Sequence, residues 1–173
     1  KMIEKGKIKP VNDNAARAHF DILTTTLKAH GYIQYEFSNY GKEGFFSRNN
    51  TAYWLGKQYL GIGPSAHSFD GKTRKWNISN NTKYIKSLEK GDLPFEEEVL
   101  SEVDRYNEYV MTRLRTMWGI DLTEVEAKFG RKFKQHLISE ASKEIALGML
   151  EEDGDKLTIT SKGKFLSDGI ASN

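Results

Sequence analysis

Cysteine is absent from this sequence of 173 residues. Without thiolates the chain cannot form a disulfide, provide a cysteine nucleophile, or ligate zinc or an iron–sulfur cluster through sulfur. These kinds of chemistry are therefore excluded for the chain acting alone. Any site that it carries must be built from other side chains and from the backbone.

Long apolar runs and a strong net charge are also missing. No apolar run approaches the roughly 18 residues that span a bilayer, and no signal peptide is visible, so no transmembrane segment is expected. The 26 basic and 24 acidic residues leave a formal net charge of +2, which gives no strong attraction to nucleic acid or to a membrane surface. Aromatic residues are plentiful, and 9 Phe, 8 Tyr and 3 Trp supply enough apolar area for a folded core.

The first part of the chain predicts a helix followed by a strand. The helix should begin at Asn12 or Asp13 and end at His30-Gly31. Its apolar positions repeat every three or four residues, at Ala16, Phe20, Leu23 and Leu27. Residues 32–37 alternate and are rich in aromatic side chains, which predicts a strand. A helix that leads by a short turn into a strand is typical of one αβ step in a parallel sheet or barrel.

Residues 39–57 are predicted to form a long irregular loop of glycine-spaced aromatic residues, and a loop of this length is usually functional. Residues 58–69 begin like a buried strand and become small at the far end. A tight turn at Asp70-Gly71 should lead into a returning strand over residues 74–78. A further helix is predicted from Asn81, ending before Gly91.

The last third of the chain has a helical pattern. A long amphipathic helix is predicted from Val99 to Met117, followed by two shorter helices that Gly130 separates. An acidic turn over residues 151–155 and a strand over residues 156–160 come next. Ser161 should then cap a final helix that contains Phe165, Leu166 and Ile170.

Three helices, a small β-wing and a closing helix resemble a winged-helix arrangement. We therefore place a domain boundary near Pro94 to Glu98. The predicted fold class is α+β, with one domain over residues 1–95 and a helical, winged-helix-like domain over residues 96–173.

The sharpest chemical feature is the run Gly61-Ile62-Gly63-Pro64-Ser65-Ala66-His67-Ser68. Its small residues leave the backbone uncovered at the end of a predicted strand, where ligands of parallel α/β folds bind. The alternative is a β-bulge or a close strand–helix contact, which requires small residues for packing alone. A dinucleotide-binding fingerprint is excluded, because the third glycine and the following helix are missing.

His67 lies near the end of this run. It could ligate a metal, donate a hydrogen bond or stack on a cofactor, and the alternative is a histidine satisfied by a backbone carbonyl. The other histidines lie within or at the ends of predicted helices and form no constellation; they are His19, His30 and His136.

A second candidate site is the loop that carries Arg48, Asn49, Asn50, Tyr53 and Trp54. A cation, amides and aromatic rings together suit a planar anionic ligand, held by stacking and by charge-assisted hydrogen bonds. A loop that is pinned by its own aromatic residues is the equal alternative.

Two charged regions predict structure rather than a site. Glu96-Glu97-Glu98 precedes the predicted long helix and should stabilise the positive end of its dipole. The lysines of the tail are offset by nearby glutamates and aspartates, so this domain is not expected to bind DNA.

Four motifs follow one another along the chain: Tyr35-Glu36-Phe37-Ser38-Asn39, Tyr53-Trp54, Gly61-Ile62-Gly63-Pro64-Ser65-Ala66-His67, and Leu157-Thr158-Ile159-Thr160-Ser161. In this order they resemble the oxygen-independent coproporphyrinogen III oxidase-like family of radical S-adenosylmethionine proteins. The likeness is greatest to the heme chaperone branch of this family and runs the full length of the chain.

The resemblance implies a fold and a set of cofactors. Residues 1–95 would supply the last αβ unit or units of a partial (β/α) barrel with extra β-structure, and the helical domain would cover the barrel mouth. S-adenosylmethionine and a [4Fe–4S] cluster would serve the full-length protein in the cytoplasm. The wall that faces S-adenosylmethionine would comprise Gly61, Gly63, Ser65, Ala66 and His67.

Two departures from the family pattern bear on the site. The Cys-x-x-x-Cys-x-x-Cys cluster loop is absent, in agreement with first residues, 1–6, that look cut from a longer protein. The heme chaperone branch has His-Asn-x-x-Tyr-Trp where this chain begins the motif with Asn49, whose amide is a poor iron ligand. Heme binding would then need His67 or an upstream residue as ligand, with Tyr53 and Trp54 stacking on the macrocycle.

Three functions follow as expectations. The first is a heme chaperone-type protein, which binds heme and passes it to an acceptor protein. The second is a genuine oxygen-independent coproporphyrinogen III oxidase, which decarboxylates its substrate to protoporphyrinogen IX. The third is a winged-helix interaction module. For the first two, heme or porphyrinogen is the partner, and this chain alone is expected to be inactive.

Overall fold

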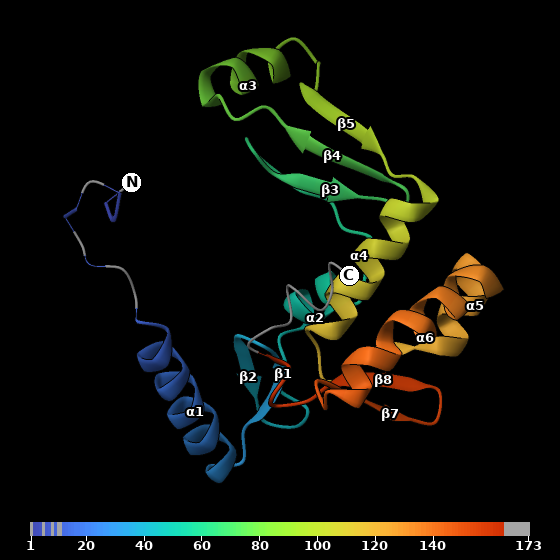
Figure 1. Ribbon diagram of the computed structural model, residues 1–173. Coiled ribbons are helices and arrows are strands. Elements are labelled where there is room, and N and C mark those ends of the chain that lie inside the picture. The colour runs from blue at the N-terminus through green and yellow to red at the C-terminus, as the bar shows by residue number, and fades with distance from the viewer. Residues whose placement is uncertain (1, 5, 8, 10–11, 165–173) are drawn as a thin grey trace. The chain divides into compact units, whose positions relative to one another are not determined.

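The computed structural model describes residues 2–4, 6–7, 9 and 12–164 (Figure 1). Over these residues the chain forms six α-helices and eight strands, which pair into three small antiparallel sheets. The predicted α+β class is therefore confirmed. None of the described helices combines the length and the apolar character needed to cross a bilayer.

The chain divides into two compact units, Lys1–Phe46 and Ser47–Asn173. The boundary near Pro94 to Glu98 that the sequence indicates falls inside the second unit. A division between a barrel part and a helical domain at that point stays a prediction.

In the first unit, helix α1 (Asp13–Ala29) is confirmed at both ends. Its N-cap is Asn12, whose Oδ1 accepts a hydrogen bond from the backbone N of Ala15 at 3.0 Å. At the other end Gly31 has φ of 76°, the left-handed conformation that commonly follows a helix.

The predicted strand after this helix is also present. Strand β1 (Ile33–Glu36) pairs antiparallel with β2 (Asn39–Gly41). The turn between them is held by Glu36, whose side chain is 1% exposed and accepts hydrogen bonds from Ser38 and Asn39. A parallel neighbour for β1 is not found among the described residues, so the parallel sheet stays a prediction.

The second unit begins with helix α2 (Arg48–Trp54), where the sequence predicted an irregular loop. Ser47 caps this helix by accepting a hydrogen bond from the backbone N of Asn50 at 3.3 Å. The prediction of a loop over residues 39–57 was therefore wrong for residues 39–41, which form β2, and for residues 48–54. The local signal for this helix is the N-cap Ser47, although the glycine-rich residues before it favour a loop.

A three-stranded antiparallel sheet follows, in the order β3-β4-β5 (Figure 1). Its strands are β3 (His67–Phe69), β4 (Thr73–Asn77) and β5 (Phe95–Val99), and helix α3 (Asn81–Leu88) joins the last two. The turn at Asp70-Gly71, the returning strand and this helix confirm the predictions. The buried strand predicted from residue 58 was wrong, because Leu60 and Ile62 are 78% and 87% exposed and only Tyr59 bridges to Phe69.

The run Glu96-Glu97-Glu98 lies in β5 and not at a helix N-terminus, so that prediction was also wrong. The run pairs with β4, where Glu96 accepts a hydrogen bond from Nε1 of Trp76 at 3.0 Å and Glu97 forms an ion pair with Lys75 at 3.1 Å. These cross-strand partners explain why an acidic run forms a strand.

The rest of the unit contains α4 (Glu102–Leu114), β6 (Ile120–Asp121), α5 (Leu122–Phe129), α6 (Arg131–Ala146), β7 (Leu150–Asp153) and β8 (Lys156–Ile159). Strand β8 lies between β6 and β7 in the sheet. Helix α4 begins later than predicted, because Ser101 and Asp104 form a capping box. The core here is almost inaccessible to solvent and includes Ile120, Val125 and Leu157.

The predicted acidic turn over residues 151–155 is shorter than expected, because residues up to Asp153 belong to β7. The strand over residues 156–160 is confirmed as β8. Most of the final helix predicted from Ser161, including Phe165, Leu166 and Ile170, lies outside the described residues.

Candidate functional site

The small-residue run forms a loop that folds back on the start of β3. A Cβ built on Gly61 would lie 2.1 Å from the carbonyl oxygen of His67. This distance is too short for any residue with a side chain to replace Gly61 without a shift of the backbone. The backbone N of Gly61 donates a hydrogen bond to Oγ of Ser68 at 3.0 Å. Gly61 is therefore required by the close approach of the chain to itself, which favours the packing interpretation at this position.

The middle of the run is pinned to β4 by Asn77, which is buried. Its Nδ2 donates to the carbonyl oxygen of Gly63 at 2.9 Å, and its backbone N donates to that of Ala66 at 2.9 Å. Gly63 has φ of 101° and Ser65 has φ of 61°, the one non-glycine residue with positive φ among the described residues. Such conformations persist only where the surroundings impose them, so the loop is held in one shape.

A cavity of about 430 Å³ lies beside this loop. Of the predicted S-adenosylmethionine wall, Ser65 and His67 line it, whereas Gly61, Gly63 and Ala66 do not. The rings of His67 and Trp76, both in the lining, have centroids 6.2 Å apart and an interplanar angle of 32°. An aromatic surface with nearby serine and asparagine side chains is compatible with an adenosine-like ligand.

The residues do not fit an iron–sulfur cluster. The chain has no cysteine, and among the described residues no group of three or more His, Asp or Glu side chains converges as a metal site. Any cluster of the full-length protein must therefore take its ligands from outside this chain.

The second predicted site, now helix α2, is only partly gathered together. Arg48 and Asn49 are exposed on its first turn, and Tyr53 is 55% exposed. The ring of Trp54 meets that of Tyr53 edge-on at 5.6 Å, and the Arg115 guanidinium lies 5.1 Å from its centre.

Three polar atoms on this helix are buried without a partner. They are Oδ1 of Asn50, Oγ1 of Thr51 and Nε1 of Trp54. Buried polar groups usually have a hydrogen-bond partner, so these atoms distinguish α2 from a helix that is merely pinned by its aromatic residues.

A larger cavity, which we call the basic cavity, brings together residues from both predicted sites. It has a volume of about 800 Å³ and is lined by Tyr53 of α2 and His67 of β3, together with residues of β4, α4 and α5. One wall is a row of aromatic rings, in which Tyr59 lies 5.8 Å from Tyr53 and 6.2 Å from Phe69. The other predicted residues of α2 are not among its lining residues.

Cations dominate the charge of the basic cavity. Among the described residues, its lining contains Lys57, Arg74, Arg105, Arg113 and Lys128 but only one carboxylate, that of Glu108. Glu108 forms an ion pair with Arg74, and this hydrogen bond outweighs burial and raises the pKa of the guanidinium.

Behind the lining, Glu124 holds two more of these cations. Its carboxylate lies 3.2 Å from Arg113 and 2.6 Å from Lys128 and accepts a hydrogen bond from the Tyr109 hydroxyl at 2.7 Å. Burial opposes ionisation of Glu124, but hydrogen bonds from Lys128 and Tyr109 and the charge of Arg113 outweigh it, so its pKa is lowered. Burial and the bond to Glu124 raise the pKa of Tyr109.

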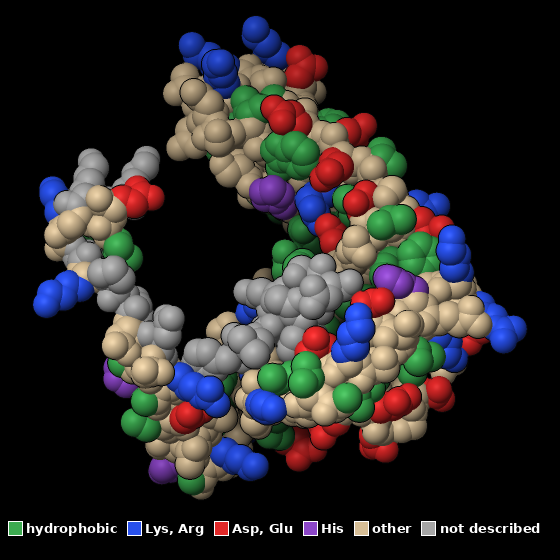
Figure 2. Space-filling view, viewed as in Figure 1, with side chains coloured by type: hydrophobic (Ala, Val, Ile, Leu, Met, Phe, Trp, Pro, Cys, Tyr) green, Lys and Arg blue, Asp and Glu red, His purple; other side chains and the backbone are tan. Residues whose placement is uncertain are grey.

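The cations on α4 and α5 were not identified as site residues from the sequence, because acidic residues nearly balance the basic residues of this part of the chain. One signal could have found them. Arg105, Tyr109 and Arg113 are spaced four residues apart, which places them on one face of α4. Figure 2 shows both signs of charge interspersed over the visible face of the second unit, so total charge does not reveal this local grouping.

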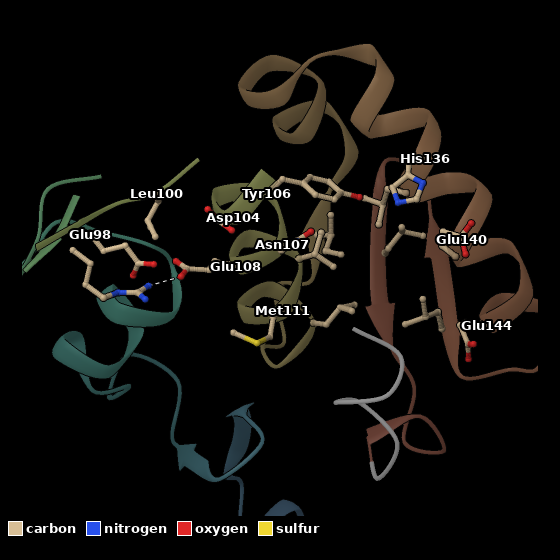
Figure 3. Close-up of a pocket in the computed structure, with 18 residues that line it drawn as sticks. Glu98, Leu100, Asp104, Tyr106, Asn107, Glu108, Met111, His136, Glu140 and Glu144 are labelled. Atoms are coloured by element: carbon tan, nitrogen blue, oxygen red, sulfur yellow. Dashed lines mark hydrogen bonds and ion pairs between the residues drawn. The ribbon is translucent and has the colours of Figure 1, made fainter. Parts of the chain in front are cut away.

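A third cavity, which we call the acidic groove, has a volume of about 670 Å³ and a different character (Figure 3). Its floor is apolar and includes Leu114, Ile120 and Leu157. Carboxylates line its rim, with Asp104 and Glu108 on α4 and Glu140 and Glu144 on α6, as Figure 3 shows. This groove is a poor match for an anionic ligand.

Comparison with known proteins places the chain near one group. Residues 100–166 match the family described as "HemN C-terminal domain". A protein of Mycobacterium tuberculosis named heme chaperone HemW is 30% identical over 169 residues, 97% of this chain and 41% of that protein. The Bacillus subtilis protein of the same name is 28% identical over 172 residues, 98% of this chain and 45% of that protein. The chain spans less than half the length of these relatives.

Among solved structures, coproporphyrinogen III oxidase (HemN) from Escherichia coli, a radical SAM enzyme, is similar with a TM-score of 0.66 and 18% identity. The likeness covers 88% of this chain and 39% of that enzyme, and at this identity it establishes a shared fold. Together these matches confirm the family resemblance that the ordered motifs indicated.

Proposed function

We propose that this chain is the C-terminal part of a radical S-adenosylmethionine protein of heme metabolism, and that the whole protein binds heme and transfers it to an acceptor. The observation that carries this proposal is the 30% identity to a protein named heme chaperone over 97% of the chain. The partial-barrel origin of the first residues and a cytoplasmic location are expectations that rest on the same resemblance.

The order of elements from α4 to β8 supports a winged-helix-like domain. A helix, a short strand, two helices and a hairpin follow one another, and the short strand β6 pairs with β8 of the hairpin. In the proposed protein this domain serves as a structural cover and not as a DNA reader, because its groove is rimmed by carboxylates that repel phosphate.

Ser65 and Trp76 would hold S-adenosylmethionine in the cavity beside the small-residue loop, whereas His67, which lines both cavities, would face the ligand of the basic cavity. When bound, S-adenosylmethionine would serve the whole protein as a source of a radical or of a methyl group. The role of this chain is to shape one wall, since the loop is fixed by Asn77 and carries no cluster ligand.

Heme as cargo would meet the aromatic row of the basic cavity. Asn49 stands where the heme chaperone branch has histidine, and it is exposed on α2 without lining the cavity. His67 does line the cavity, as do the rings of the aromatic row, and an imidazole is a good iron ligand. If heme binds in this cavity, His67 is the residue of this chain that would ligate its iron.

The proposal is tested on the full-length protein by titration with hemin and by an assay of coproporphyrinogen III decarboxylation. We expect a shifted Soret band that saturates, no decarboxylation, and a changed spectrum in the His67→Ala variant but not in a His30→Ala control, since His30 lies outside the cavity. Decarboxylation without a hemin spectrum would instead identify an oxidase and overturn the carrier assignment.

A further inference from the structure

Arg105 on α4 differs from the other cations of the basic cavity. Its side chain is half-buried, and its Nε is buried without a hydrogen-bond partner. Among the described residues, no carboxylate forms an ion pair with it. A buried guanidinium nitrogen without a partner is unfavourable, because it has lost water and gained nothing in return.

The neighbouring cations are already neutralised in part. Arg74 is paired with Glu108, and Glu124 holds both Arg113 and Lys128. These pairs fix the positions of the cations, while Arg105 and Lys57 add positive charge that no described carboxylate balances. The cavity is therefore arranged to attract an anion, and Arg105 and Lys57 are the two lining cations without an ion pair among the described residues.

The aromatic part of the lining selects against a small inorganic anion. The rings of Tyr53, Tyr59 and Phe69 form a continuous aromatic row, and Met111 and Phe129 also line the cavity. Aromatic rings stack on flat apolar groups, and the volume of about 800 Å³ lies within the range of sites for organic ligands. The complementary ligand is flat and apolar in its centre and carries carboxylates at its edge.

We propose that the basic cavity binds the carboxylate side chains of a planar tetrapyrrole, that Arg105 is the principal donor to a carboxylate, and that Tyr53 and Tyr59 stack on the macrocycle. The identity of the ligand as a tetrapyrrole rests on the proposed function, whereas the carboxylate site rests on the charges and rings of the cavity. An Arg guanidinium binds a carboxylate in a bidentate manner, which orients the ligand as well as attracting it.

The test uses the full-length protein and two metal-free probes, protoporphyrin IX and its dimethyl ester, which share a macrocycle and differ in free carboxylates. We expect Arg105→Gln to weaken binding of the free acid by about tenfold or more, while leaving the affinity for the ester unchanged. Arg105→Lys keeps the positive charge but removes the planar guanidinium that can donate two parallel hydrogen bonds, so it should give an intermediate affinity for the free acid. Arg131→Gln is the matched control, because Arg131 is exposed on α6 and does not line the cavity.

Equal affinity of Arg105→Gln and the unchanged protein for the free acid would overturn the carboxylate site. An equal loss of affinity for the acid and the ester would also overturn it, since it would show a packing role. If hemin gives no spectral shift but protoporphyrin IX binds in an Arg105-dependent way, the carrier function fails and the carboxylate site stands. If the unchanged protein binds neither porphyrin, the site is wrong.

Discussion

The two large cavities of the second unit lie against different faces of the same helix, α4. Arg105, Tyr109 and Arg113 face the basic cavity, whereas Asn107, Val110 and Leu114 face the acidic groove. Where the cavities adjoin, Arg74, Glu108 and Met111 line both. One cavity has an aromatic wall with cations, and the other has an apolar floor with carboxylates on its rim. The periodicity of α4 therefore separates opposite charges that nearly cancel along the sequence.

The two cavities also differ in how much their lining residues contribute to the stability of the fold and to ligand binding. The floor of the acidic groove belongs to the core, because Ile120 and Leu157 are each 1% exposed. The wall of the basic cavity includes Tyr53, which is 55% exposed and contributes little to the core. A substitution in the groove should thus change folding, and one in the basic cavity should change binding.

The largest effect is expected for Leu157→Ala. Removing a side chain that is 1% exposed should lower the free energy of unfolding by about 2–5 kcal/mol, because it leaves a cavity in the core. Denaturant unfolding of the full-length protein measures this loss. Leu147→Ala is the matched control, since Leu147 is 57% exposed and should cost about 0.5 kcal/mol or less.

The same Leu157→Ala protein also tests the separation directly. Under conditions in which it is folded, its affinity for protoporphyrin IX should equal that of the unchanged protein. A lower affinity would show that the two faces of α4 are coupled.

A smaller effect is expected on acid stability from Glu124. Its pKa is lowered in the folded state from an ordinary value of 4.5, so its contribution to stability is complete above that pH and is lost as the pH falls through the folded pKa. Glu124→Gln should lower the melting temperature at neutral pH and flatten its decline below pH 4.5. A decline as steep as that of the unchanged protein would contradict this role for the carboxylate.

The smallest effect is expected for Glu140→Gln on the rim of the acidic groove. Glu140 lines the groove but not the basic cavity, and water and salt screen its charge over that separation. The affinity for protoporphyrin IX, followed by fluorescence, should therefore change by less than about twofold. A change as large as that of Arg105→Gln would abolish the distinction between the cavities.

Local signals predicted much of the fold. Helices α1, α3 and α5 begin where Asn12, Asn80 and Asp121 accept hydrogen bonds from backbone N–H groups, and such caps can be read from sequence. The acidic strand β5 could not be read in this way. Its conformation depends on Lys75 and Trp76, which are about twenty residues away in the chain.

The sequence predicted only two of the residues that line the basic cavity. Tyr53 and His67 were recognised by residue type, and both line the basic cavity. Three of the five cations, Arg105, Arg113 and Lys128, come from α4 and α5, and a tertiary contact rather than a motif brings them to the cavity. Total charge could not reveal Arg105, because what distinguishes it is the lack of a partner in the folded chain.

The position of Glu124 has a consequence for any carboxylate that enters the basic cavity. Arg113 and Lys128 already share the negative charge of Glu124, so an incoming anion must compete with a resident one for these two cations. The competition limits how tightly the anion is held and lets Glu124 reclaim both cations as the anion departs. An internal carboxylate that competes for the same two cations weakens the hold on a bound anion, which is compatible with the release step of the proposed carrier function.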